Sequence, residues 1–167
     1  AIVLVVGAVV AFFLYQHNET EIAASEALTK VSMPQLMGTG GAANTADAYL
    51  KVATTYPKTD AGARAVLLAA GSLFGQGKYP EAKAQFERFR REHPGSPLVG
   101  AAMLGVAACL DTLGQSREAM AAYKELIDRR SGDNALPQAR FALARLHEAQ
   151  NEPDQARRLF EEVERTD

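Results

Sequence analysis

Three histidines and one cysteine are the side chains best suited to metal binding or nucleophilic chemistry in this chain. A zinc site or a catalytic relay needs several such groups at a local or helical spacing that brings them together. His17, His93 and His147 stand in three separate contexts, and Cys109 has no second cysteine to pair with. We therefore expect solvated or capping histidines, no metal site and no disulfide, with Cys109 as a small core residue.

The stretch from Gly71 to Lys78, GSLFGQGK, has the outline of a phosphate-binding loop. Such a loop follows a strand, places serine or threonine after its lysine and begins with a glycine. Here Tyr79 follows the lysine, Ser72 occupies the place of the first glycine, and no strand is expected before it. The sequence thus predicts no catalytic or cofactor-binding residues and no enzyme.

The charged clusters of the chain mix both signs. Arg88, Arg90 and Arg91 are interleaved with Glu87 and Glu92, and the acidic residues near the C-terminus alternate with arginines in the same way. Overall, 18 basic against 20 acidic residues give a net charge of −2, which favours solvated helix faces over a nucleic-acid site. Partner choice must then depend on shape.

Helices are expected to hold the histidine, cysteine and charged residues named above in place. The 167 residues are rich in alanine, contain no tryptophan and include only 7% aromatic residues, a composition that favours closely packed helices over a sheet. This length suits one modest domain plus an appendage. We therefore expect an all-α fold.

A short pattern recurs three times along the chain. An alanine near the start of each copy follows the previous one after 37 residues, with an aromatic residue four positions later and an apolar residue three further on. Repeats of this length are typical of stacked helical or strand units. The copies contain Ala82, Phe86 and Phe89, then Ala119, Tyr123 and Leu126, then Ala156, Phe160 and Val163, and Thr45, Tyr49 and Val52 form a degenerate earlier copy.

Each copy reads as the second helix of a hairpin. The small residue lets two helices approach closely, Pro80 and Pro153 suit a first helical turn, and Gly77, Gly114 and Asn151 suit the left-handed residue that ends the helix before. First helices are expected at 60–76, 97–113 and 136–150, with Ala70, Ala107 and Ala144 as their small-residue column. His147 replaces the leucine of earlier units, and the charged final helix at 154–164 marks an end of the stack.

The first residues, Ala1 to Tyr15, are apolar and uncharged. They cover part of the ~20 residues that a membrane helix needs, and because no initiator methionine precedes them we expect further residues upstream. An uncleaved anchor is the favoured interpretation, with a signal peptide or a buried core helix as alternatives. The flank Gln16–Glu21 has no lysine or arginine, which favours an outward-facing domain. The expected organisation is an anchor at 1–18, a membrane-proximal helix at 19–37, a flexible linker at 38–44 and a repeat domain at 45–167.

The chain resembles the tetratricopeptide repeat over about residues 45 to 164. The resemblance lies in the small residues of both helices, the aromatic residue four positions after the small residue of the second helix, and the endings Tyr56-Pro57 and His93-Pro94. The 37-residue period exceeds the usual ~34. The resemblance implies a right-handed α-solenoid of three to four helical hairpins. With the apolar N-terminus, the chain also resembles the bacterial family of the ancillary SecYEG translocon subunit and the cell-division coordinator. That likeness implies a single-pass inner-membrane protein with its repeats in the periplasm.

A repeat solenoid lines its concave groove with first helices. The predicted partner-binding groove therefore consists of Arg64, Leu67, Phe74, Leu104, Asp111, Phe141, Arg145 and Glu148. Repeats that clamp a C-terminal carboxylate place lysine and asparagine on these faces, which this chain lacks. Leu67, Leu104 and Phe141 either pack between helices or form an apolar strip that accepts a partner peptide.

The expected function is a membrane-anchored scaffold for protein–protein interaction, without cofactors, that acts as an accessory or chaperone-like subunit near the export translocon. The alternative is a periplasmic coordinator of envelope assembly or cell division. Expected partners are proteins or peptides, including translocon subunits and exported clients, and the membrane through the N-terminal helix. No nucleic-acid partner is expected.

Overall fold

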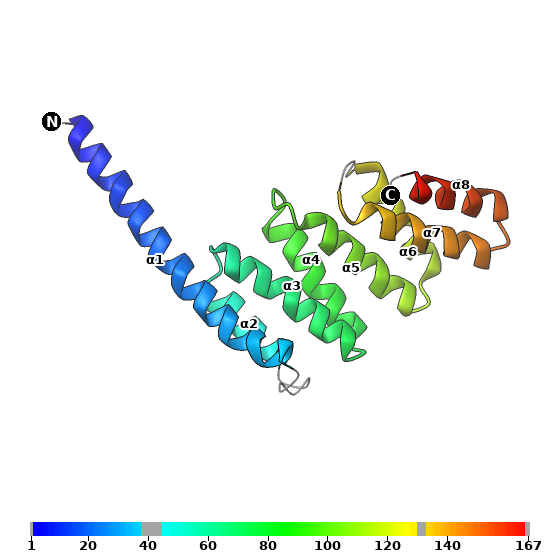
Figure 1. Ribbon diagram of the computed structural model, residues 1–167, viewed down its shortest axis with the longest axis horizontal. Coiled ribbons are helices and arrows are strands. Elements are labelled where there is room, and N and C mark those ends of the chain that lie inside the picture. The colour runs from blue at the N-terminus through cyan, green and yellow to red at the C-terminus, as the bar shows by residue number, and fades with distance from the viewer. Residues whose placement is uncertain (1, 38–44, 130–132, 166–167) are drawn as a thin grey trace. The chain divides into compact units, whose positions relative to one another are not determined.

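The computed structural model describes residues 2–37, 45–129 and 133–165, and all regular structure in these ranges is α-helical, as predicted (Figure 1). The expected linker at 38–44 lies outside the described residues. The chain divides into two compact units, Ala1–Ala69 and Ala70–Asp167, with α3 running across their boundary. The helices are α1 (Ile2–Leu36), α2 (Thr45–Thr55), α3 (Asp60–Gly75), α4 (Tyr79–Glu92), α5 (Val99–Thr112), α6 (Ser116–Arg129), α7 (Leu136–Ala149) and α8 (Pro153–Glu164).

In the second unit, α4 to α8 pack against one another in chain order, and α5 also contacts α7 (Figure 1). The helix bounds lie within two residues of those expected from the repeat. The largest difference is at α5, which begins at Val99 because Pro97 and Leu98 lie in a turn. The predicted hairpins α5–α6 and α7–α8 are therefore confirmed.

The small-residue columns are the points of closest packing. The exposed fractions of Ala82, Ala119 and Ala156 are 0%, 0% and 2%. The matching residues of the first helices, Ala70, Ala107 and Ala144, are each at 0%. A methyl group at these positions lets two helix backbones approach, whereas a larger side chain would force them apart.

The helix-ending residues adopt the predicted left-handed conformation, with φ of 75° at Gly77, 74° at Gly114 and 62° at Asn151. Each stands in the same pair of backbone hydrogen bonds: the N–H of Gly77 donates to Phe74 O and the N–H of Lys78 donates to Leu73 O, both at 2.9 Å. The same pairs recur at Gly114 and Asn151. This Schellman arrangement satisfies carbonyls at the end of each first helix and turns the chain into the second.

In the first unit, the N-terminal segments expected at 1–18 and 19–37 lie on a single helix up to Leu36. α1 is one continuous helix through the predicted boundary between residues 18 and 19, and it packs against α2. Ala24 is 0% exposed, and the Tyr49 hydroxyl donates to Ser32 Oγ at 3.3 Å. The stretch expected as a membrane-proximal helix is therefore the C-terminal part of α1, which packs against α2.

A side chain of α1 also caps α3. The Glu21 carboxylate accepts the N–H of Asp60 at 2.8 Å and that of Ala61 at 2.9 Å, while Thr59 Oγ1 accepts the N–H of Gly62 at 2.9 Å. These are N–H groups that a helix cannot satisfy by itself. Residues 39 and 40 positions apart in the chain are thus joined at the start of the helix.

The predicted transmembrane helix is not supported, since no helix in the described ranges combines the length and apolar character needed to cross a membrane.

Cys109 is a core residue, as expected, with an exposed fraction of 0%. Burial raises the pKa of its thiol to about 11, so the thiol stays protonated at neutral pH and ionises only as the pH rises toward that value. We expect the thiol-reactive reagent DTNB at pH 8 to modify the native chain at least tenfold more slowly than the urea-unfolded chain. Equal rates would contradict this burial.

Candidate functional site

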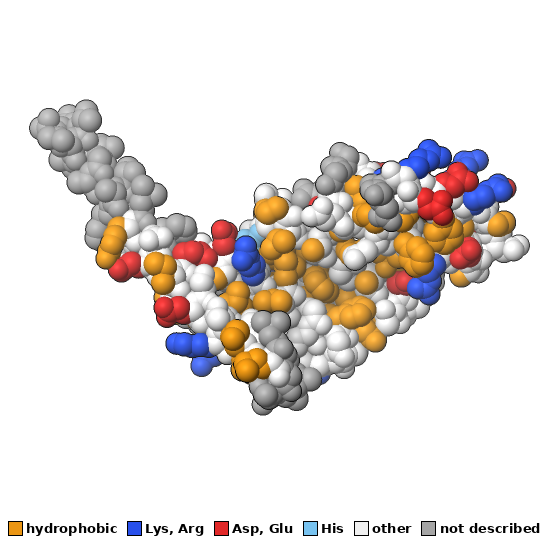
Figure 2. Space-filling model, viewed as in Figure 1, with side chains coloured by type: hydrophobic (Ala, Val, Ile, Leu, Met, Phe, Trp, Pro, Cys, Tyr) orange, Lys and Arg blue, Asp and Glu red, His pale blue; other side chains and the backbone are white. Residues whose placement is uncertain are grey.

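The first helices of the last two complete hairpins carry most of the predicted groove residues. Leu104 and Asp111 lie two turns apart on one face of α5, and Phe141, Arg145 and Glu148 follow one another on one face of α7. α5 and α7 contact each other, and we call these five residues on the two helices the α5/α7 face. On the side drawn in Figure 2, apolar side chains lie over these helices, with acidic and basic side chains beside them.

The apolar part of the α5/α7 face is Leu104 and Phe141, which occupy equivalent positions in successive hairpins. Leu104 is half-buried, and Phe141 is 51% exposed although it is a large aromatic residue. Its ring contacts Phe160 of α8 edge-on, with centroids 5.5 Å apart. Core apolar side chains of α7, such as Leu143 and Leu146, are instead buried. Phe141 therefore presents apolar surface to solvent.

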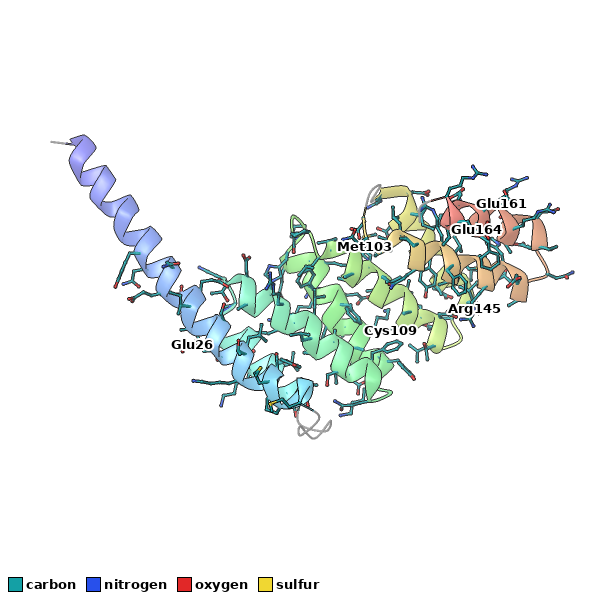
Figure 3. The ribbon with its side chains drawn as sticks, viewed as in Figure 1. Glu26, Met103, Cys109, Arg145, Glu161 and Glu164 are labelled. Carbon is teal, nitrogen blue, oxygen red and sulfur yellow. The ribbon has the colours of Figure 1, made fainter. Side chains whose placement is uncertain are left out.

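The polar part of the same face includes Asp111, which is half-buried, and Arg145, which is exposed. Tyr123 is 2% exposed, and burial raises its pKa to about 12. The Asp111 carboxylate adds to this rise and the Arg145 guanidinium opposes it, so both charges act on the hydroxyl. Figure 3 shows Arg145 on the edge of α7 that lies next to the C-terminal part of α5, away from Glu161 and Glu164 of α8.

The remaining predicted groove residues, Arg64, Leu67 and Phe74, lie on α3. Phe74 is half-buried at the end of α3, and its ring contacts Tyr79 edge-on with centroids 5.1 Å apart. Arg64 is exposed and Leu67 half-buried in the part of α3 that belongs to the first unit. We therefore restrict the candidate site to α5 and α7, which lie within one unit.

Sequence reasoning assigned Tyr123 to the aromatic packing column, and its exposed fraction of 2% agrees with that role. Phe86 and Phe160 hold the same column position without a hydroxyl group, so packing alone does not require a phenol at this place.

The other candidates for chemistry have structural roles. Arg88 pairs with Glu92 at 3.0 Å, and Arg90 of α4 pairs with Glu125 of α6 at 3.1 Å, which makes this cluster a self-neutralised surface. His147 Nδ1 lies 2.6 Å from Glu152 Oε2 in the turn between α7 and α8. Within the described ranges, no group of three or more histidine, cysteine, aspartate or glutamate side chains is arranged to hold a metal ion.

Two family models described as tetratricopeptide repeat match the chain, one at residues 67–135 and the other at residues 137–162. Together they cover α4 to α7 and most of α8. The predicted repeat class is therefore confirmed, while the narrower resemblance to the translocon-associated family stays a prediction. Comparison with curated proteins finds no match.

Solved structures share the fold. A crystal structure of MamA has a TM-score of 0.68 at 14% sequence identity, with 88% of this chain and 82% of that chain covered. A Podosopora anserina protein described as a kinesin light chain with nearly identical TPR-like repeats gives a TM-score of 0.62 at 18% identity, covering 83% of this chain and 72% of that one. At such identities the likeness concerns the helical solenoid alone.

Proposed function

We propose that this chain, whose residues 67–135 and 137–162 are tetratricopeptide repeats, is a non-catalytic scaffold that binds a peptide segment of another protein on the α5/α7 face. The observation that carries the proposal is Phe141, a large aromatic side chain that is 51% exposed on a first helix. Leu104 holds the equivalent position of the preceding hairpin and is half-buried.

The energetic argument follows from the area that a partner would cover. Burying an apolar side chain of this size contributes ~1.5–3 kcal/mol, and aromatic anchors dominate the affinity of many interfaces. A peptide that places an apolar residue against Phe141 and Leu104 would remove both from water. Helical and extended peptides can both dock in this way.

Replacing Leu104 and Phe141 together with serine should abolish most partner capture while the domain stays folded, because neither side chain is fully buried. A photo-crosslinking amino acid at Ala108, which is half-buried and one helical turn after Leu104 on α5, would report occupancy of the face in native membranes. Quantitative mass spectrometry of the crosslinked proteins would compare the double variant with the parent chain.

The matched control is the pair Leu98→Ser and Leu113→Ser, which removes two leucines that are 36% and 40% exposed at the ends of α5. Capture should survive in the control. Equal capture by a folded Leu104→Ser and Phe141→Ser variant would contradict the proposal.

Two further elements of the proposal concern location. The uncharged run Ala1–Tyr15 supports anchoring in a bacterial inner membrane, and the resemblance to the translocon-associated family supports a periplasmic repeat domain that serves exported clients. The same crosslinking experiment addresses both, because translocon subunits should be among the products. Recovery of cell-wall enzymes alone would contradict this placement and favour a coordinator of envelope assembly or division.

A further inference from the structure

We infer that the side of α1 opposite α2 is a docking surface for a basic, amphipathic helix of another protein. This surface, which we call the α1 stripe, belongs to the first unit, whereas the α5/α7 face belongs to the second. Its members follow one another at helical spacing along one side of α1. They are Tyr15, Glu19, Ile22, Glu26, Met33 and Met37.

The apolar members of the α1 stripe are large side chains that are open to water. Their exposed fractions are 62% for Tyr15, 53% for Ile22, 47% for Met33 and 71% for Met37. At roughly 3.6 residues per turn, these four positions fall within about 60° of arc around the helix axis. Met37 continues the same path just beyond α1, because its N–H donates to Met33 O at 3.0 Å. Exposed apolar side chains gathered in this way indicate an interaction surface, whereas single ones scattered over a protein do not.

The contact of α1 with α2 uses the other side of the helix. Ala24 is buried there, and Leu28 and Val31 are half-buried. These three positions lie roughly opposite Ile22 and Met33 around the helix axis. Packing against α2 therefore occupies one side of α1 and leaves the α1 stripe uncovered.

Two carboxylates lie within the α1 stripe. Glu19 and Glu26 are exposed and stand two helical turns apart, with Ile22 between them. Glu19 accepts a hydrogen bond from the Tyr15 hydroxyl at 2.6 Å, and Glu26 forms no ion pair or hydrogen bond within the described part of the chain. Lys30 lies at the edge of the stripe, so its charge offsets only one of the two carboxylates. Figure 2 shows acidic side chains alternating with hydrophobic ones along the coloured part of α1.

This alternation of charge and apolar surface determines which helix fits. A helix that covers the apolar members would also cover both carboxylates, and this is costly unless cations pair with them. Lysine or arginine at two positions two turns apart would face Glu19 and Glu26, as charged residues do across paired helices. An apolar residue between them would contact Ile22. The docking side of the partner helix therefore reads apolar, basic, apolar, basic, apolar.

A second copy of this chain fits the α1 stripe less well than a basic helix. In a parallel pair, Glu19 and Glu26 would each face their own counterpart, and like charges across paired helices repel. An antiparallel pair that sets Glu26 against Lys30 would place Glu19 opposite Met37, which leaves that carboxylate against an apolar side chain.

A lipid surface also fits less well. Interfacial helices keep their charged residues on the side away from the acyl chains and carry lysine and arginine there. The α1 stripe would instead direct Glu19 and Glu26 into the lipid together with Ile22.

Synthetic helical peptides of about 21 residues, or six turns, provide the probe. One peptide carries leucines and two lysines in the order given above, and its counterpart carries glutamates in place of the lysines. Fluorescence anisotropy measures the affinity of each for the full chain. We expect the lysine peptide to bind at least tenfold more tightly than the glutamate peptide, because only its charges complement the stripe.

Two double variants test the members of the α1 stripe. Glu19→Lys combined with Glu26→Lys should reverse the preference, so that the glutamate peptide binds more tightly. Ile22→Ser combined with Met33→Ser should weaken binding of the lysine peptide at least tenfold, because the apolar contact is lost. All four side chains are exposed, so circular dichroism should show an unchanged helix content.

Matched controls change the same types of residue elsewhere in the first unit. Asp47→Lys replaces another exposed carboxylate, on α2, and Leu68→Ser removes a leucine that is 42% exposed on α3. Both variants should bind the two peptides as the parent chain does. The Leu104→Ser and Phe141→Ser variant should also do so, which separates this surface from the α5/α7 face.

Three results would overturn the inference. The first is equal affinity of the parent chain for the lysine and glutamate peptides. The second is a dimer in sedimentation velocity that Glu26→Lys dissociates, which would assign the stripe to a second copy of the chain. The third is a blue shift of the fluorophore NBD, attached to Met33→Cys, on vesicles of phosphatidylethanolamine and phosphatidylglycerol without peptide, which would assign the stripe to lipid.

Discussion

Truncating Leu126 to alanine is expected to destabilise the repeat unit by about 2–5 kcal/mol, because a fully buried leucine leaves a cavity when its side chain is removed. Leu126 is 0% exposed and lies on α6, which packs against α5 on one side and α7 on the other. Urea unfolding followed by circular dichroism at 222 nm would measure the change in the unfolding midpoint.

The matched control is Val163→Ala, at the same column position of the last hairpin. Val163 is half-buried, and α8 packs mainly against α7, so the smaller side chain leaves a site that solvent can already reach. We expect a loss of less than about 1 kcal/mol there, below the usual range for buried truncations. Equal losses at the two positions would contradict the difference between an internal and a terminal repeat.

The repeat region was predictable from sequence because each of its requirements recurs at a fixed distance. Closest helix approach needs a small residue, which places Ala82 and Ala119 at 0% exposure, and a left-handed helix end needs glycine or asparagine, as at Gly77 and Asn151. Chance agreement at one position means little. Agreement across several columns at one period leaves few alternatives to a helical hairpin.

The role of α1 was not predictable in the same way. Met33 stands at the position where later first helices have alanine, so the column that identifies a first helix is broken there. The hydrogen bonds from the start of α3 to α1 instead go to one carboxylate, that of Glu21. Such a contact has no periodicity, and a composition-based reading assigns this stretch to a separate membrane-proximal helix.

Only part of the candidate site was predictable from the sequence. Spacing along a helix identifies which residues share a face, and it placed Phe141 and Arg145 together on α7. It could not distinguish packing from exposure for Phe141, which depends on the neighbouring ring of Phe160. It also could not show that Asp111 is half-buried while Arg145 is exposed, because that depends on how the helices pack.

Glu21→Ala is expected to loosen the junction between α1 and the start of α3. The substitution removes a carboxylate that accepts two backbone N–H groups at 2.8 and 2.9 Å, at a helix end where the macrodipole also favours a negative charge. Water can replace part of these hydrogen bonds because Asp60 is exposed, so we expect a local loss of about 1–3 kcal/mol. Amide hydrogen exchange at Asp60 and Ala61 should accelerate at least fivefold.

Glu26→Ala is the matched control, since Glu26 is an exposed glutamate of the same helix, away from α3 (Figure 3). In Glu21→Gln, the exchange rates at Asp60 and Ala61 should lie between those of the two alanine variants, because one amide oxygen can still accept a hydrogen bond but carries no charge. Unchanged exchange at Asp60 and Ala61 in Glu21→Ala would mean that the hydrophobic contact of α1 with α2 holds the first hairpin by itself. Exchange rates that rise from Glu26→Ala through Glu21→Gln to Glu21→Ala would instead identify Glu21 as the residue that couples α1 to the first turn of α3.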